Sequence, residues 1–181
     1  MGLLVTVMRR ICESDRFVGA GKWLTAASTP GREVHGKTCG IVGLGRIGRA
    51  IAKRAEAFGM SVCYHGPRQK PDAAFPYYSD LESMAREADC LVVCCPLTPA
   101  SRNLIDARIL DALGPEGFLV NVARGPVVDE AALLAALKSR SIAGAALDVF
   151  WDEPRVPAAL IEMENVVLVP HIGSSTQEVR E

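Results

Sequence analysis

Short apolar segments alternate with helical patterns along most of this 181-residue chain, and that alternation constrains the fold more than any other feature. The segments are apolar at nearly every position, which is typical of strands that are buried on both faces of a sheet. We expect strands at residues 38–42, 61–64, 91–94, 118–121, 143–148 and 165–169, and helices at 46–58, 81–88, 106–113 and 130–139. This order predicts an α/β fold, a doubly wound parallel sheet with helices on both faces.

The first part of the chain has a different pattern. Apolar residues recur there at helical spacing, which predicts one amphipathic helix over residues 3–18. Residues 19–36 are rich in Gly, Ser, Thr and Pro and are interpreted as a loop. A chain of this length favours one hydrophobic core. We therefore interpret residues 1–181 as one domain: a leading helix (1–18), a loop (19–36), the core (37–172) and the start of an exit helix (173–181).

Composition excludes several classes of partner and site. The formal net charge of −1 gives no reason to expect binding to nucleic acid or to an anionic membrane. No segment has the length of a transmembrane helix or the pattern of a signal peptide. The six cysteines lack zinc-site spacing and several lie in apolar runs, so we expect no metal site. Reduced thiols of this kind favour a cytoplasmic location.

A glycine-rich turn follows the first core strand. Residues 43–48 read Gly-Leu-Gly-Arg-Ile-Gly and open the helix at 46–58. In a Rossmann-type domain, Gly43 permits the tight turn, Gly45 lets a pyrophosphate approach the backbone, and Gly48 lets the helix lie close to the strand. The helix N-terminus then presents free N–H groups to the phosphates. The context of strand, turn and helix predicts dinucleotide binding.

The end of the second strand bears on which dinucleotide binds. Enzymes that use NAD usually have an acid there for the ribose hydroxyls, whereas a 2′-phosphate requires cations. This chain has no acid before Asp72, and three basic side chains precede it: His65, Arg68 and Lys70. The pattern favours NADP over NAD, with a solvated basic loop as the alternative.

Three later segments each end a predicted strand and carry a functional side chain: Arg124, Glu153 and His171. Because parallel strands share a carboxyl edge, these side chains are expected to converge beside a bound ligand. Each residue alone has a simpler structural interpretation. His171 could be a surface histidine, Arg124 could cap a strand end, and Glu153 could belong to a turn. The combination favours a catalytic site.

Four motifs in order resemble the D-isomer-specific 2-hydroxyacid dehydrogenase family: GLGRIG, NVARGPVVDEAAL, LDVFWDEPRVP and PHIGSST. The resemblance covers essentially the whole chain, and the spacing of Arg124, Glu153 and His171 matches the family's triad without a gap. Segments 53–58 and 111–115 are similar to the reductases of hydroxyphenylpyruvate, hydroxypyruvate and glyoxylate that prefer NADP. One departure is that the triplet Gly66-Pro67-Arg68 carries its cation one position later than these relatives do.

The resemblance implies a role for each matching residue. Arg124 would bind the carboxylate of the substrate. His171 would protonate the keto oxygen while hydride reaches the carbonyl carbon, and Glu153 would orient the imidazole. Asp148 would lie near the nicotinamide carboxamide. The remaining cofactor contacts would be Leu44, Arg46 and Ile47 around the pyrophosphate, together with Cys95, Pro96, Thr98, Val122, Ala123 and Gly173.

The resemblance also implies a second domain and a dimer partner. Members of the family have a substrate-binding domain built from segments on both sides of the cofactor domain, and both segments are expected to be absent here. We therefore expect weak cofactor binding and slow reduction of a 2-keto acid. A homodimer is expected through residues 3–18 and the region of Trp23, which could instead pack back on its own domain. A cofactor-sensing or corepressor-like dimer is the alternative function.

Overall fold

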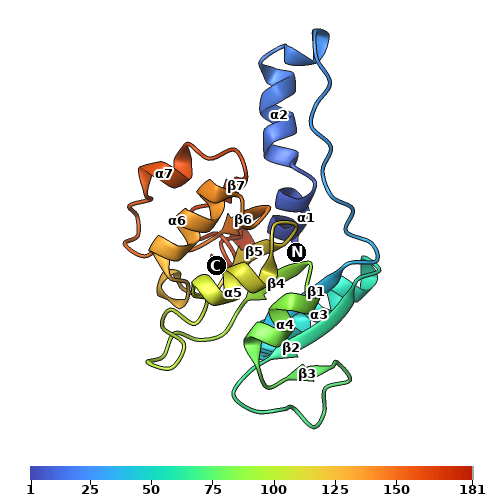
Figure 1. Ribbon diagram of the computed structural model, residues 1–181, viewed down its shortest axis with the longest axis vertical. Coiled ribbons are helices and arrows are strands. Elements are labelled where there is room, and N and C mark those ends of the chain that lie inside the picture. The colour runs from blue at the N-terminus through green and yellow to red at the C-terminus, as the bar shows by residue number, and fades with distance from the viewer. Residues whose placement is uncertain (181) are drawn as a thin grey trace.

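The computed structural model describes residues 1–180, and it contains a seven-stranded, all-parallel sheet. The strand order is β3-β2-β1-β4-β5-β6-β7, so the chain starts near the middle and winds outward in both directions (Figure 1). The strands are β1 (Thr38–Val42), β2 (Ser61–His65), β3 (Tyr77–Tyr78), β4 (Cys90–Val93), β5 (Phe118–Asn121), β6 (Gly144–Leu147) and β7 (Val166–Leu168). The doubly wound fold predicted from the alternation is confirmed.

Helices cover both faces of this sheet because the central strands are apolar on both sides. The α-helices are α1 (Gly2–Met8), α2 (Ile11–Gly19), α3 (Arg46–Ala57), α4 (Leu81–Glu87), α5 (Ala107–Leu113), α6 (Glu130–Ser139), α7 (Ala158–Ile161) and α8 (Gln177–Arg180); η1 (Lys22–Leu24) and η2 (Gly125–Val127) are 3-10 helices. One core cluster contains buried residues of α1 and α3, and the other contains those of α4, α5 and α6. No helix among residues 1–180 is long and apolar enough to cross a membrane.

The single helix expected at residues 3–18 is wrong. The chain forms two helices, and Arg10 between them adopts the left-handed conformation with φ of 54°. Helix α1 buries Leu4, Val7 and Met8 against the sheet, whereas α2 buries no residue. Figure 1 shows α2 standing away from the body of the molecule. Apolar periodicity continues across the break, so it could not reveal one residue in a left-handed conformation.

Three helices start at an aspartate that caps them. Asp80, Asp106 and Asp129 each accept a hydrogen bond from the backbone N–H three residues later, at the starts of α4, α5 and α6. A side-chain acceptor at this position satisfies one of the free N–H groups of the first turn. Asp129 thus caps the start of α6. These caps fix where the loops at the sheet edge end and the helices begin.

Four short elements were not predicted from the sequence: β3, α7, η1 and η2. The other strands and helices of the core start and end within one or two residues of the predicted bounds. Since all strands are parallel, their carboxyl ends lie along one edge of the sheet. That edge carries every loop in which the sequence predicts a functional residue.

Candidate functional site

The glycine turn between β1 and α3 is shaped by close backbone contacts. Gly43 has a φ of 101°, and a Cβ on it would lie 2.8 Å from the backbone of Cys95. A Cβ on Gly48 would overlap the carbonyl of Gly43, so the helix lies directly against the turn. A Cβ on Gly45 would meet nothing within 4 Å. The start of α3 is thus open toward solvent, as a phosphate site at a helix N-terminus requires.

The residues between these glycines differ in exposure. Leu44 is buried in the core, whereas Arg46 and Ile47 are exposed. Leu44 can therefore offer a phosphate only its backbone, while the side chains of Arg46 and Ile47 are accessible from the open side of the turn.

The loop after β2 is held mainly by tyrosines. Nδ1 of His65 lies 3.0 Å from the carbonyl oxygen of Tyr78. The Tyr77 hydroxyl donates to the carbonyl of Gly66 at 3.0 Å, and the Lys70 N–H donates to the Tyr64 hydroxyl at 2.7 Å. The side chains of Pro67 and Arg68 project from this frame and are exposed.

Asp72, the first acid after β2, is engaged elsewhere. Arg49 of α3 donates to its carboxylate at 2.8 Å. This hydrogen bond is the main reason that the pKa of Asp72 lies below its ordinary value. The end of β2 therefore lacks the carboxylate that would bind the ribose hydroxyls of NAD.

The loop after β4 lies against the glycine turn. The Sγ of Cys94 is 3.2 Å from the carbonyl oxygen of Gly43, and burial raises the pKa of this thiol to about 12. Farther along, the Ser101 hydroxyl donates to the carbonyl of Pro96 and accepts from the N–H of Thr98. Cys95 thus packs against Gly43, Pro96 and Thr98 are hydrogen-bonded to Ser101, and the neutral thiol of Cys94 gives the turn no negative charge.

Asn121 fixes the loop that carries Arg124. It is the last residue of β5 and is fully buried. Its Oδ1 accepts from the Ala123 N–H at 3.0 Å, and its Nδ2 donates to the Arg124 carbonyl at 3.1 Å. The Arg124 side chain is exposed, and its Nη1 donates to the Ala123 carbonyl. A buried polar group needs hydrogen-bond partners. Because both the oxygen and the nitrogen of the Asn121 amide bond to this loop, they fix the backbone path from Val122 to Arg124.

The loop after β6 packs against the Arg124 loop, with backbone in contact with backbone. A Cβ added to Gly125 would overlap the carbonyl group of Phe150 and lie 2.5 Å from the Trp151 nitrogen. The Trp151 Nε1 donates to the Val128 carbonyl at 2.7 Å. The position of Arg124 is thereby tied to the loop that carries Glu153.

Glu153 and His171 form a direct pair. The Oε2 of Glu153 lies 2.8 Å from Nδ1 of His171, and its Oε1 accepts from the Phe150 N–H at 3.0 Å. The hydrogen bond from His171 is the largest cause that lowers the pKa of Glu153, followed by that from Phe150. An ionised carboxylate only accepts, so Nδ1 carries a proton and Nε2 is left for chemistry.

Asp148 holds the turn that presents His171. Its side chain is 2% exposed, Oδ1 accepts from the Ile172 N–H at 2.6 Å, and Oδ2 accepts from the Gly173 N–H at 2.9 Å. His171 itself has a φ of 54°, a left-handed conformation that costs a residue with a side chain about 1–2 kcal/mol. Such a conformation persists where the surroundings fix it, and Asp148 supplies that constraint.

Comparison with known proteins identifies this arrangement. Residues 1–173 match the family model described as D-isomer specific 2-hydroxyacid dehydrogenase, NAD binding domain. The chain belongs to this family. Its NAD-binding domain is 49% identical over 180 residues to glyoxylate/hydroxypyruvate reductase A of Arabidopsis thaliana, and 47% identical over 180 residues to hydroxyphenylpyruvate reductase of Plectranthus scutellarioides. Each alignment covers 99% of this chain and 58% of the relative, so the chain spans little more than half of either protein.

Solved structures give the same result. The NAD-binding domain superimposes with a TM-score of 0.93 and 43% identity on an NADPH-dependent glyoxylate/hydroxypyruvate reductase of Sinorhizobium meliloti, in complex with NADP and malonate. That match covers 99% of this chain and 57% of the other. A glyoxylate reductase of Paecilomyes thermophila aligns with a TM-score of 0.91 and 34% identity. The Rossmann-type architecture predicted from the glycine turn is therefore confirmed.

The NAD-binding domain brings some predicted residues into contact and leaves others linked only through loops. Glu153 and His171 are hydrogen-bonded to each other. Arg124 is linked to them indirectly, because its loop packs at Gly125 against the loop that carries Glu153. Sequence reasoning missed Asn121 and Trp151. The sequence did contain a signal for Asn121, because it is a polar residue at the end of an otherwise apolar strand. The partner of Trp151 lies 23 residues away, and nothing in the sequence indicated it.

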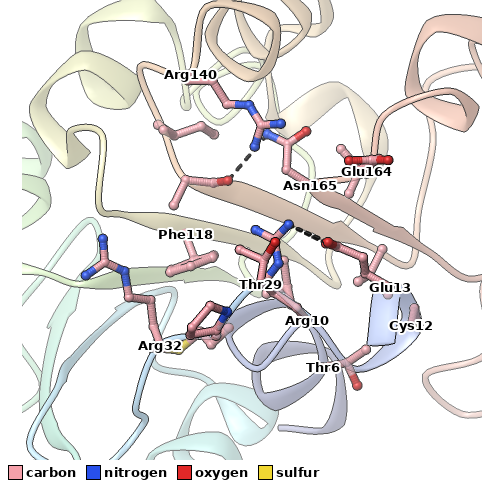
Figure 2. Close-up of a pocket in the computed structure, with 18 of the residues that line it drawn as sticks. Thr6, Arg10, Cys12, Glu13, Thr29, Arg32, Phe118, Arg140, Glu164 and Asn165 are labelled. Atoms are coloured by element: carbon pink, nitrogen blue, oxygen red, sulfur yellow. Dashed lines mark hydrogen bonds and ion pairs between the residues drawn. The ribbon is translucent and has the colours of Figure 1, made fainter. Parts of the chain in front are cut away.

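Two of the cavities in the part of the chain that the structure describes flank the sheet of the NAD-binding domain. One, of about 350 Å³, is lined by Glu153, His171 and mainly apolar neighbours such as Phe150 and Val156. The other, of about 400 Å³, lies at the amino ends of β5 and β7 beneath α1 and α2, and Figure 2 shows Arg10 paired with Glu13 beside it. Within residues 1–180, no cluster of three or more His, Cys, Asp or Glu side chains could hold a metal ion.

Proposed function

We propose that this chain is the cofactor-binding part of an NADP-dependent reductase that converts 2-keto acids such as glyoxylate, hydroxypyruvate or 4-hydroxyphenylpyruvate to 2-hydroxy acids. The observation that carries the proposal is the Glu153–His171 pair, held at the carboxyl edge of the sheet next to the Arg124 loop. The relatives named above support the reaction class. We propose residues 1–181 as one dinucleotide-binding domain.

The residues divide the work as follows. The guanidinium of Arg124 binds the substrate carboxylate through two parallel hydrogen bonds and fixes its orientation. Nε2 of His171 lies opposite the nitrogen that Glu153 engages and donates a proton to the keto oxygen. Glu153 stabilises the charged imidazolium before that transfer. A nicotinamide cofactor, when bound, would supply the hydride. Asp148 and Asn121 act through the backbone of the loops they hold.

The cofactor contacts are proposed along the same edge. The open space at Gly45 and the free start of α3 fit a pyrophosphate. Cys95, Pro96, Thr98, Val122, Ala123 and Gly173 would line the channel between this turn and His171. The exposed Arg68 and the engagement of Asp72 by Arg49 favour NADP over NAD.

The cofactor preference is tested by titrating the purified chain with NADPH and NADH. We expect NADPH to bind more tightly, and Arg68→Ala to weaken NADPH by about tenfold while leaving NADH unchanged, since one charge-assisted hydrogen bond is lost. Lys138→Ala is a matched control, because Lys138 is exposed in the last turn of α6, at the end of that helix away from the carboxyl edge. Tighter binding of NADH, unaffected by Arg68→Ala, would contradict the assignment.

The reaction is tested by following NADPH absorbance with a panel of 2-keto acids. Because the relatives are much longer, we expect this chain to turn over far more slowly than they do. His171→Gln should abolish the residual rate while leaving NADPH binding within a few fold. A turnover rate equal to that of the longer relatives would contradict the expectation that substrate contacts from outside this chain are needed.

We also propose that the chain pairs with a second copy through α2 and the segment after it. Helix α2 buries no residue, and Trp23 and Leu24 are 71% and 90% exposed, so Trp23 does not pack back on its own domain. Exposed apolar side chains gathered on one projecting element are typical of an interface. Sedimentation should show a dimer that Trp23→Ser with Leu24→Ser converts to a monomer. A wild-type monomer at high concentration would overturn this.

A cytoplasmic location is proposed from the cysteines. All six are free thiols, and Cys39, Cys63 and Cys90 are buried. Free buried thiols suit a reducing compartment.

A further inference from the structure

We propose that His65 determines cofactor specificity and favours the 2′-phosphate only when its imidazole is protonated. The preference for NADPH over NADH would then weaken as the pH rises. This inference rests on the proposed function, because it deepens the assignment of the loop after β2 to the 2′-phosphate.

The first step is the hydrogen bond that fixes the ring. Nδ1 of His65 lies 3.0 Å from the carbonyl oxygen of Tyr78, on the neighbouring strand β3. A carbonyl oxygen only accepts, so Nδ1 carries the proton in the neutral ring. The other nitrogen, Nε2, has no hydrogen-bond partner among residues 1–180, and in the neutral ring it holds a lone pair. The frame of the sheet thus selects one tautomer.

The second step is the place of this ring in the fold. His65 is the last residue of β2, and its carbonyl accepts from the N–H of Gly43 at 2.9 Å, in the glycine turn. In this type of fold, the residues at the end of the second strand bind the ribose next to the adenine. The ring is half-buried, with one edge held by β3 and the other free. The free Nε2 is the atom available to whatever occupies the 2′ position.

The third step is the chemistry of that atom. A bare Nε2 can accept a hydrogen bond from the 2′-hydroxyl of NADH, but it cannot donate to a phosphate, which carries only acceptor oxygens at neutral pH. When protonated, Nε2 donates a charge-assisted hydrogen bond to a phosphate oxygen. The neutral ring therefore suits NADH, and the charged ring suits NADPH.

The charged groups around this ring come from several elements. The carboxylate of Asp80 caps α4; hydrogen bonds from Ser83 mainly lower its pKa, and the charge of His65 contributes. Arg68 and Lys70 are cations on the loop that follows His65. Arg49 of α3 is paired with Asp72, and the neighbour on β1 is the uncharged Val42. Bound phosphate itself favours the charged ring, so protonation and NADPH binding are linked.

The experiment measures the dissociation constants of NADPH and NADH for the 181-residue chain from about pH 5.5 to about pH 8.5, around the ordinary pKa of histidine. The variants are wild type, His65→Gln, and His35→Gln as a matched control. Gln can still donate to the Tyr78 carbonyl but does not titrate. His35 is exposed and precedes β1, at the opposite end of the strand from His65. Circular dichroism checks that each variant is folded.

The discrimination factor is the dissociation constant of NADH divided by that of NADPH. Ionisation of the 2′-phosphate changes this factor in every variant, and His171 affects both dinucleotides alike, so the comparison with His65→Gln isolates His65. We expect the ratio of the wild-type factor to the His65→Gln factor to fall by about tenfold across the range, the strength of one charge-assisted hydrogen bond. His35→Gln should behave as wild type.

A ratio that stays flat with pH overturns the inference. If Arg68→Ala still weakens NADPH in that case, the proposed function stands and only the role of His65 fails. If neither dinucleotide binds the wild type or any variant, both the proposed function and the inference are overturned.

Discussion

Two parts of the same sheet edge are built in different ways. The catalytic edge, which we define as residues 121–128, 148–153 and 169–173, is fixed by buried polar side chains and close backbone packing. The phosphate loop, residues 66–70, is held by two tyrosine hydroxyls and exposes Pro67 and Arg68. The difference indicates that the relative positions of Glu153 and His171 are fixed by contacts within this domain. Residues 66–70, which we propose distinguish the cofactors, can change with little effect on the fold.

The strongest way to break the catalytic edge is Gly125→Ala. The added Cβ would overlap the Phe150 carbonyl group, and backbone cannot move aside as a flexible side chain can. We expect the free energy of unfolding to fall by about 3 kcal/mol or more, at the upper end of what overpacking costs. Urea denaturation measures this change. Gly66→Ala, whose Cβ would meet nothing within 4 Å, is the matched change in the phosphate loop and should cost less than about 1 kcal/mol.

A smaller effect is expected for Asp148→Ala. The change removes both acceptors that hold the turn of Ile172 and Gly173, so we expect a loss of about 2 kcal/mol in unfolding free energy. The turn should also lose its fixed conformation, and the NMR signals of His171 should broaden or shift. Asp148→Asn retains one acceptor but sets an NH2 donor against the other N–H, so it is expected to lose about as much. Unchanged signals in Asp148→Ala would show that the left-handed conformation of His171 needs no such support.

Gly45→Ala separates binding from stability. A Cβ there meets no protein atom within 4 Å, and the backbone φ of −88° is open to alanine. We expect the melting temperature to stay within a few degrees while NADPH binds at least about tenfold more weakly, because the methyl occupies space needed by the pyrophosphate. Calorimetric titration checks the affinity. Unchanged affinity would place the phosphates elsewhere.

The smallest effect concerns the pH dependence of stability. The pKa of Glu153 is lowered in the folded state, chiefly by His171, so its stabilising contribution is present above the ordinary pKa of a glutamate. It is lost as the pH falls through the lowered folded value. Glu153→Gln should remove this contribution, at most about 1 kcal/mol because both partners are exposed. The unfolding free energies of wild type and Glu153→Gln should therefore converge in acid, and parallel curves would contradict this.

The sequence predicted those features that depend on local pattern. Strands such as Thr38–Val42 and Phe118–Asn121 were placed correctly because an unbroken apolar run has few other uses. The glycine turn was predicted because each glycine has a steric task. The pairing of Glu153 with His171 rested on linked spacing of motifs, since periodicity says nothing about contacts between loops.

Features that depend on distant partners escaped prediction. The break at Arg10 has no composition signal, and β3 is too short to show a period. The bonds of Trp151 to Val128 and of Asp148 to residues 172 and 173 join segments about 20 residues apart. Such contacts are set by the path of the backbone through space. A sequence pattern records a residue's own preference for burial, and it does not record the group that the residue will meet.

The hydrogen bond from the Gly43 N–H to the His65 carbonyl joins the phosphate-binding turn to the strand that leads into the phosphate loop, and it uses main-chain atoms only. Any side chains can therefore be placed at positions 66–70 without disturbing that joint. The sequence of this loop can change while the backbone that supports it stays the same. Redesign of the proposed cofactor preference can therefore be confined to His65 and residues 66–70, with Glu153 and His171 left unchanged.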